Sequence, residues 1–278
     1  MKPIAQQTIL ITGATDGLGK STAHALAAQG ATLLLHGRNQ QKLEKTQQEI
    51  HEATGNARLA LYRADFAILE EVRQMGKAIL ADYPRLDILI NNAGIGAGKM
   101  VFPRRELSKD GYELRFAVNY LAPFLLTHLL LPALREGAPS RIINVSSIGQ
   151  EPIDFNDVML EQRYSPMRAY RQSKLAQIMF TIDLADRLKG EQISVNSLHP
   201  ASLMNTKMVY ESIPYTMSTI EDGLKTVMYV STSPHLDGVT GRYFEQLQDT
   251  HANPQAYDEG ARRKLWQLSE RLTGTKLL

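Results

Sequence analysis

A tyrosine and a lysine stand four residues apart in the segment "YRQSK", at Tyr170 and Lys174. On a helix, two residues at this spacing share a face. A lysine ammonium beside a phenol favours the phenolate, so we expect Lys174 to lower the pKa of Tyr170 from about 10 toward neutral pH. Such a tyrosine can exchange a proton with a developing alkoxide, the proton step that carbonyl reduction requires. The pair therefore predicts acid–base chemistry on a substrate oxygen.

Two further polar residues belong to candidate motifs. Ser147 closes "INVSS" and Asn119 lies within "FAVNY". Taken singly, a serine after a strand can be a cap, and an asparagine on a helix can simply bond the backbone. Ser146 is the alternative serine, whereas Tyr164 is a weaker tyrosine candidate because Arg168, not a lysine, follows it by four residues.

A glycine-rich segment, "TGATDGLGKST" at residues 12–22, follows the first apolar run. The triphosphate-binding pattern G-x-x-x-x-G-K-[ST] needs four residues between its glycines. Here five residues separate Gly13 from Gly19, and Gly17 stands between them. The spacing favours a turn at which a pyrophosphate approaches the N–H groups of a following helix, with a purely structural turn as the alternative.

In chain order, T-G-x-x-x-G-x-G, N-N-A-G at 91–94, the helical asparagine, the serine and Y-x-x-x-K resemble the short-chain dehydrogenase/reductase family, from about residue 7 to about 245. The segments "AYRQSKLAQIMFTIDLADRL" and "LHPASLMNTKMV" are most similar to its retinol-dehydrogenase-like and WW-domain-oxidoreductase-like members. The resemblance implies that Tyr170 is the acid/base and that Lys174 also binds the nicotinamide ribose. It implies that Ser147 bonds the substrate oxygen and that Asn119 holds a proton-relaying water.

The resemblance also implies a nicotinamide dinucleotide bound along the strand ends. The implied contacts, besides Tyr170 and Lys174, are Gly13, Thr15, Asp16, Gly17, Leu18, Gly19, Arg38, Asn39, Asp65, Asn91, Ala93, Gly94, Pro200 and Thr206. Among them, Asp65 resembles the family's adenine contact and Asn91 its adenosine-ribose contact, although both residues can act as caps. The chain departs from the family at Pro200-Ala201, where the family has Pro-Gly, and in a longer interval between Ser147 and Tyr170.

The residues near position 38 bear on the choice of cofactor. Enzymes that use NAD place an acidic residue about 20 residues beyond the glycines, to bond the ribose 2′-OH. From Gly17 to Leu43 this chain has no acidic residue, and Gly37 stands at the acid's position, followed by Arg38 and Asn39. A guanidinium there can hold a 2′-phosphate through paired hydrogen bonds, unless it is merely an exposed arginine. We therefore predict NADP(H) in preference to NAD(H).

The elements that must position these residues alternate regularly along the chain. Apolar runs predict buried strands, and longer periodic segments between them predict helices. The expected strands are 7–13, 32–37, 57–65, 87–94, 141–147 and 193–200, and the expected helices are 18–29, 40–53, 67–82, 108–134 and 165–189. This alternation predicts an α/β fold, a single-domain Rossmann-type doubly wound parallel sheet with helices on both faces. With no repeat or linker, residues 1–278 form one domain, with substrate-side loops at 148–164 and 202–220 and a C-terminal tail at 246–278.

Composition excludes several classes of site. A net charge of +2 without basic runs argues against nucleic acid as a partner. The chain has no cysteine, which excludes disulfides, thiolate zinc sites and iron–sulfur clusters, so we expect no metal site and a reducing, cytoplasmic setting. The start of the chain does not read as a signal peptide. The apolar segment 120–134 is short of the about 20 residues that a membrane helix needs, so we expect a core helix and no transmembrane segment.

The substrate is predicted only by class. Apolar side chains in the two substrate-side loops suit an irregular pocket or lid for a lipophilic ketone, aldehyde or alcohol, and equally a subunit interface or core. They are Phe155, Met159, Leu160, Met204, Met208, Tyr210, Tyr215 and Met217. Helices 108–134 and 165–189 are candidates either for the core or for a homo-oligomer interface. The alternative functions are a non-catalytic NADPH-binding sensor or scaffold, and a related epimerase or dehydratase.

Overall fold

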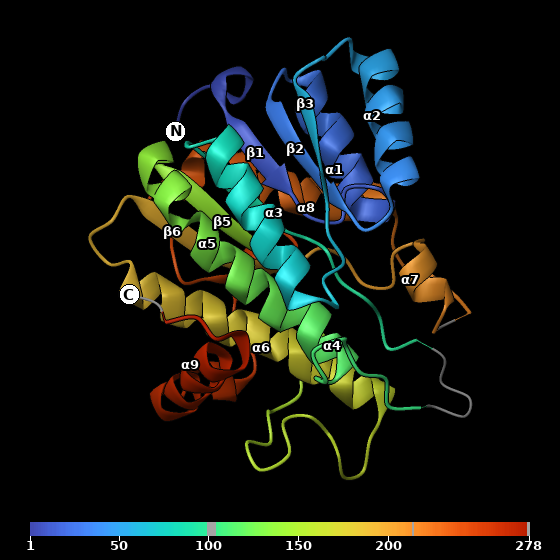
Figure 1. Ribbon diagram of the computed structural model, residues 1–278, viewed down its shortest axis with the longest axis vertical. Helices are drawn as coiled ribbons and strands as arrows, with labels where there is room; N and C mark the ends of the chain where they lie inside the picture. Colours follow the sequence, from blue (N-terminus) through green and yellow to red (C-terminus); the bar gives the residue numbers. More distant parts are fainter. Residues whose placement is uncertain (99–103, 213, 277–278) are drawn as a thin grey trace.

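The computed structural model describes residues 1–98, 104–212 and 214–276. Its centre is one sheet with the strand order β3-β2-β1-β4-β5-β6-β7-β8 (Figure 1). The strands are β1 (Thr8–Ile11), β2 (Thr32–Gly37), β3 (Leu59–Arg63), β4 (Ile88–Asn91), β5 (Ser140–Val145), β6 (Ile193–His199), β7 (Tyr243–Glu245) and β8 (Gln248–Thr250). All neighbouring pairs are parallel except β7 with β8. The strand order reverses between β1 and β4, which is where doubly wound folds bind their ligands.

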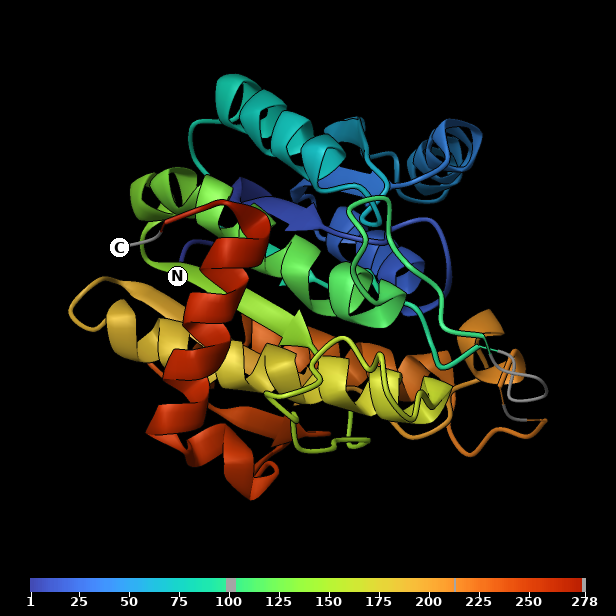
Figure 2. The ribbon, with the colours of Figure 1, turned by 60° about the horizontal axis from the view of Figure 1, so that its bottom comes forward.

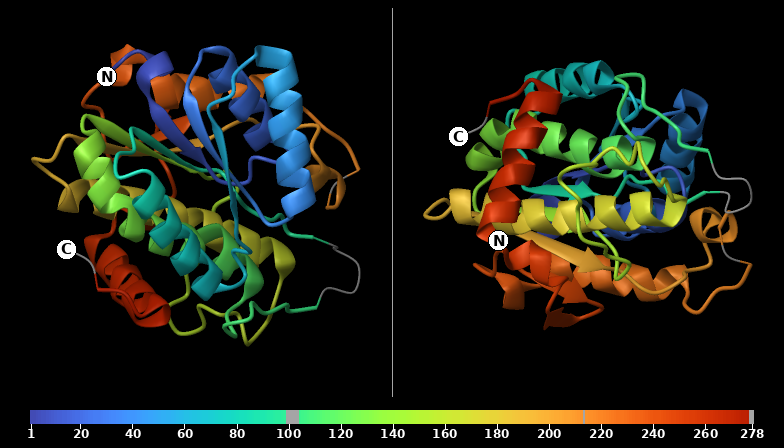
Figure 3. Two further views of the ribbon diagram at one scale, coloured as in Figure 1. Left: turned by 45° about the horizontal axis from the view of Figure 1, so that its top comes forward. Right: turned by 90° about the horizontal axis from the view of Figure 1, so that it is seen from below.

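Helices cover both faces of this sheet. One face carries α1 (Gly17–Ala28), α2 (Gln40–Thr54) and α8 (Ile220–Thr232), and the other carries α3 (Leu69–Asp82), α5 (Ala122–Gly137) and α6 (Pro166–Arg187) (Figure 3, left). The strands supply apolar side chains to both sides, because alternate residues of a strand point to opposite faces. In β1, Leu10 joins the core under α3 and α5, while Ile9 and Ile11 join the core under α1 and α8. The predicted doubly wound parallel sheet is thereby confirmed.

The helix predicted over 108–134 begins later in the structure than the sequence indicated. The first helical residue is Leu114, because Asp110-Gly111 makes a turn, with Gly111 at φ +85°, that pairs Leu107 with Glu113. Glu113 then caps the helix by accepting a hydrogen bond from the amide of Phe116 at 2.8 Å. After α4 (Leu114–Phe116), a π-helical turn over Ala117–Leu121 leads into α5.

This continuous helical stretch, Leu114–Gly137, is long and apolar enough to cross a membrane by those two criteria alone. Its apolar window is 89% buried inside the molecule. The stretch therefore packs as a core helix, as the sequence indicated.

The C-terminal tail contains a helix, α9 (Glu259–Thr273), that the sequence did not predict. It lies across α6 on the outside of that layer (Figure 2). Trp266 of α9 is 3% exposed and packs against Phe124 and Phe180, with ring centroids 5.4 and 6.0 Å away. The hydroxyl groups of Tyr120 and Ser269 are 2.7 Å apart. The parts of α5 and α6 under α9 therefore belong to the core of this chain.

Candidate active site

The glycine turn joins β1 to α1 and requires its glycines. Gly13 and Gly17 have φ values of +69° and +48°, a region that side chains with a Cβ rarely adopt. A Cβ on Gly13 would lie 2.9 Å from the Cα of Ala93, and one on Gly19 would overlap the carbonyl oxygen of Gly13. The turn thus presents main chain, without side chains, at the N-terminus of α1, which suits the close approach of a pyrophosphate.

Three residues that the sequence did not single out hold this turn. The Thr12 hydroxyl accepts hydrogen bonds from the amides of Asn92 and Ala93 at 3.0 and 2.9 Å, and Asn92 Nδ2 donates to the carbonyl of Thr12 at 2.8 Å. Nδ1 of His36 accepts the amide of Gly13 at 3.2 Å. Thr12 begins the T-G-x-x-x-G-x-G motif, and Asn92 belongs to the N-N-A-G motif. For His36, the signal in the sequence was a polar residue within an apolar strand.

His36 is neutral in this position. Because Nδ1 accepts from Gly13, Nε2 carries the proton and donates to the carbonyl of Ala64 at 3.0 Å. The ring stacks on Phe66 at 4.2 Å between centroids, and burial lowers the pKa of His36 to about 4. The residue therefore ties the glycine turn to the end of β3 with one defined tautomer.

Lys20, the lysine of the glycine-rich segment, forms an ion pair. Its ammonium pairs with Glu49 of α2. Asp16 caps α1 by accepting the amide of Gly17 at 2.8 Å, and Leu18 is buried in the first turn of that helix. The polar groups around the turn are thus arranged for helix capping and for main-chain contacts.

The ends of β2 and β3 bring Arg38, Asn39 and Asp65 to one edge. Arg38 is exposed, and its guanidinium makes no hydrogen bond or ion pair within the described parts of the chain. Asn39 caps α2 by accepting the amide of Lys42 at 2.9 Å. Asp65 Oδ1 accepts the amide of Ala67 at 2.9 Å. Asn39 therefore caps a helix and Asp65 closes a local turn, whereas Arg38 is available to a ligand.

Ser147, Tyr170 and Lys174 meet at the carboxyl end of β5. Lys174 Nζ donates to the carbonyl of Val145 at 2.9 Å and to Gln177 Oε1 at 3.0 Å, and lies 5.9 Å from the centroid of the Tyr170 ring. The Ser147 hydroxyl hydrogen-bonds the half-buried Tyr170 and accepts the amide of Gly149 at 3.0 Å. The sequence motifs are thus brought into one site.

The expected effect of Lys174 on Tyr170 is wrong for this geometry. Burial raises the pKa of Tyr170, and only the hydrogen bond with Ser147 opposes that shift. Burial also lowers the pKa of Lys174 to about 7. The ammonium is turned toward the Val145 carbonyl rather than the phenol oxygen, so desolvation outweighs the charge.

Asn119 lies in the π-helical turn and is fully buried. Its Oδ1 accepts the amide of Ile95 at 2.8 Å, and its Nδ2 donates to the carbonyl of Ile95 at 3.1 Å and to Ser173 Oγ at 2.9 Å. The wider π turn places this side chain between α6 and the segment after β4. Gly94 lies against it, since a Cβ there would be 3.2 Å from Asn119 Oδ1 and 3.6 Å from Lys174 Nζ. Asn119 therefore positions Ile95, and its water-holding role stays a prediction.

The remaining predicted residues differ in how close they lie to the site. Asn91 is buried, and its Nδ2 donates to Thr127 Oγ1 and Asn144 Oδ1, so its side-chain amide is directed into the core. The Ser146 hydroxyl donates to the carbonyl of Lys174 at 2.7 Å, which leaves Ser147 as the serine that meets Tyr170. Two predicted contacts follow β6.

The carbonyl of Pro200 accepts the Thr226 hydroxyl at 2.8 Å, which fixes the chain as it leaves β6. Thr206 precedes α7 (Lys207–Tyr210), and its Cγ2 would lie 3.4 Å from a Cβ on Gly17. Thr206 therefore lies over the glycine turn, against Gly17.

The doubly wound sheet with its glycine turn is that of a Rossmann-fold protein. The chain belongs to the short chain dehydrogenase family, whose model matches residues 7–214. Within that family it is 38% identical over 292 residues to mouse retinol dehydrogenase 14, covering 96% of this chain and 86% of the relative. The structure is similar to that of an uncharacterized protein from Mycobacterium paratuberculosis, with a TM-score of 0.82, 31% identity, and coverage of 100% and 97% of the two chains. It is also similar to a short chain dehydrogenase from Shigella flexneri complexed with NADP, with a TM-score of 0.71, 27% identity, and coverage of 89% and 100%.

Proposed function

We propose that the protein is an NADP(H)-dependent oxidoreductase that interconverts a ketone or aldehyde and the corresponding alcohol, with Tyr170 as the acid/base. The observation that carries the proposal is the meeting of Ser147, Tyr170 and Lys174 at the sheet edge that also bears the glycine turn. A hydroxyl, a phenol and an ammonium together can bind a carbonyl oxygen and hand it a proton.

The residues present fit a nicotinamide dinucleotide. Gly13 and Gly19 leave bare main chain at the start of α1, where any Cβ would collide with neighbouring atoms. Gly37 leaves no room for the acidic side chain typical of NAD sites, because a Cβ there would lie 2.7 Å from Thr15 Cγ2. The exposed guanidinium of Arg38 follows directly and suits a 2′-phosphate. The similarity to a structure that holds NADP adds support.

A nicotinamide cofactor held at this site would supply the hydride that adds to the carbonyl carbon. Ser147 donates a hydrogen bond to the carbonyl oxygen. Tyr170 gives its phenol proton to that oxygen as negative charge develops there. Because burial raises its pKa, Tyr170 stays protonated at neutral pH, which suits reduction. Lys174, whose Nζ lies 5.9 Å from the centroid of the Tyr170 ring, would bind the nicotinamide ribose, as in the family that the motifs resemble.

We extend the proposal to a lipophilic substrate and a cytosolic setting. Met208 packs on the segment after β4, 2.9 Å from where a Cβ on Gly96 would be, and so places an apolar side chain beside the site. The relative named retinol dehydrogenase 14 points to the same substrate class. The absence of cysteine suits a reducing compartment, and cell fractionation tests that part.

The experiment is a binding titration with NADPH, NADH and Mg-ATP in parallel, followed by a carbonyl panel that includes retinal and straight-chain aldehydes. We expect tight NADPH binding, weaker NADH binding, no Mg-ATP binding, and turnover of long aldehydes. Tight NADPH binding without turnover of any carbonyl compound would favour the sensor or scaffold function instead. Binding of Mg-ATP alone would overturn the proposal.

A further inference from the structure

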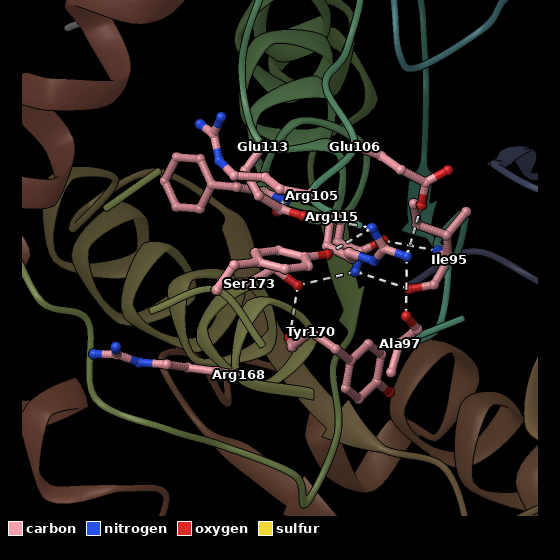
Figure 4. Close-up of polar contacts among 12 residues, drawn as sticks. Ile95, Ala97, Arg105, Glu106, Glu113, Arg115, Arg168, Tyr170 and Ser173 are labelled. Carbon is pink, nitrogen blue, oxygen red and sulfur yellow. Dashed lines mark hydrogen bonds and ion pairs between the residues drawn. The ribbon is translucent and has the colours of Figure 1, made fainter. Parts of the chain in front are cut away.

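Arg115 is a buried cation four residues before Asn119, and the mechanism above does not use it. It is 5% exposed. Its guanidinium donates to the carbonyl of Ala97 at 2.9 Å (Figure 4). It also donates to the carbonyl of Gly96 at 3.3 Å and to the hydroxyl of Tyr164 at 3.1 Å. All three of its nitrogen atoms are thus engaged with fixed groups of the protein.

Two carboxylates balance this charge. Nη2 lies 3.0 Å from Glu106, and Nη1 lies 3.6 Å from Glu113. Glu113 is 1% exposed, and burial raises its pKa. Because a buried cation without partners would be costly, the two carboxylates offset the cost of burying Arg115.

The two carbonyls belong to segment 94–98, which borders the catalytic groups. Asn119 holds Ile95 in this segment, and Gly94 lies against Lys174. On its other side, Ser212 donates to the carbonyl of Gly98 at 3.1 Å. Arg115 therefore fixes the middle of a segment that lies between the catalytic groups and the loop 202–220.

Tyr164 belongs to the other substrate-side loop, 148–164, and stands six residues before Tyr170. This loop carries two non-glycine residues in the left-handed region, Leu160 at φ +49° and Arg163 at φ +53°, which need support from their surroundings. Part of that support comes from Arg105, whose Nε donates to the carbonyl of Met159 at 2.8 Å. Tyr164 is the point at which Arg115 ties the loop to segment 94–98.

We propose that Arg115 is a positioning residue that sets the separation between segment 94–98 and loop 148–164, and thereby which carbonyl compounds reach Tyr170. The planar guanidinium can hold two carbonyls and one hydroxyl in fixed directions at once. A lysine, with a compact ammonium, keeps the charge but not this geometry. The effect on substrate choice rests on the proposed function, whereas the effect on the two segments does not.

The test compares Arg115→Lys, Tyr164→Phe and a matched control, Arg168→Lys. Arg168 pairs with Glu151 at 3.3 Å beside the same loop and, within the described residues, makes no hydrogen bond or ion pair with segment 94–98. Amide hydrogen exchange is followed in peptides that cover 94–98 and 156–164. The values of kcat and KM are measured for hexanal and decanal, and the Kd for NADPH is measured separately.

We expect Arg115→Lys to speed exchange in both peptides and to raise KM for decanal about ten-fold, with kcat for hexanal and the Kd for NADPH within about two-fold. Tyr164→Phe should speed exchange in 156–164 only, and the control should change neither peptide. Unchanged exchange in Arg115→Lys, or equal loss of kcat with both aldehydes, would overturn the proposal. If the wild-type protein reduced no aldehyde, the proposed function would fail, and the exchange data, measured without substrate, would still decide the role of Arg115.

Discussion

The Cγ2 methyl group of Thr15 occupies the space beside Gly37, only 2.7 Å from where a Cβ of residue 37 would lie. Two positions far apart in the sequence are thereby coupled, since any side chain at 37 must displace the methyl.

Gly37→Asp alone should weaken NADPH binding without improving NADH binding. Gly37→Asp combined with Thr15→Ser, which removes the methyl, should bind NADH more tightly than the wild-type protein does. Fluorescence titrations measure both, and Thr15→Ser alone is the control. Equal NADH affinity of the single and double variants would show that the methyl is not the obstacle.

Arg38→Ala should weaken NADPH binding about 10- to 100-fold, because a hydrogen-bonded pair with a charged group contributes about 1.5–3 kcal/mol. NADH lacks the 2′-phosphate, so its affinity should change less than about two-fold. The exposed Lys42→Ala, one turn along on α2, is the control for a general loss of positive charge. Equal losses for the two cofactors would contradict the assignment of Arg38.

Tyr170→Phe should lower kcat for carbonyl reduction by about 100-fold or more, with little change in the Kd for NADPH. In the wild-type protein, burial raises the pKa of Tyr170, so the phenol keeps its proton through the neutral range. The rate of carbonyl reduction should therefore not fall between pH 6 and 9 through ionisation of Tyr170. The rate of alcohol oxidation, which needs the phenolate, should rise with pH. A reduction rate that falls above about pH 7 in the wild type but not in Tyr170→Phe would contradict the direction of the shift.

Buried histidines make the protein sensitive to acid. Burial lowers the pKa of His128 to about 2, and neither ring nitrogen has a hydrogen-bond partner in the described parts of the chain. His36 behaves similarly, with a pKa of about 4. In the unfolded chain both groups take up protons near pH 6.5, but in the folded protein they do not. The free energy of unfolding should therefore fall as pH drops below about 6.5, by up to about 3 kcal/mol for His36 once pH reaches 4.

Denaturant unfolding at several pH values measures this slope. His128→Phe, which keeps an aromatic ring against Trp266, should flatten it, whereas replacing the exposed His235 by Gln should not. An unchanged slope in His128→Phe would show that this residue is not neutral in the folded protein.

The local signals in the sequence were enough for strands β1 to β6 and for the central motifs, but not for the short strands β7 and β8. Continuous apolar runs placed β1 to β6, and the spacing of Tyr170 and Lys174 put both on one helix. The residues that the sequence left out act through tertiary contacts. His36 matters because β1 and β2 lie side by side in register, which no local pattern encodes.

The same reason explains the two errors of detail. The direction of the Tyr170 pKa shift depends on burial and on where Lys174 Nζ points, and spacing on a helix fixes neither. The late start of the helix before Asn119 depends on the bridge between Leu107 and Glu113, which forms only when the turn at Gly111 closes.

Helix α9 also bears on the order in which the protein can be completed during synthesis. Phe124 and Phe180 leave the ribosome well before Trp266, which packs on both of them. Until then, part of the aromatic surface of α5 and α6 has no partner within the chain. The nascent protein thus exposes an apolar surface until α9 covers it, and chaperones would be expected to act in this interval.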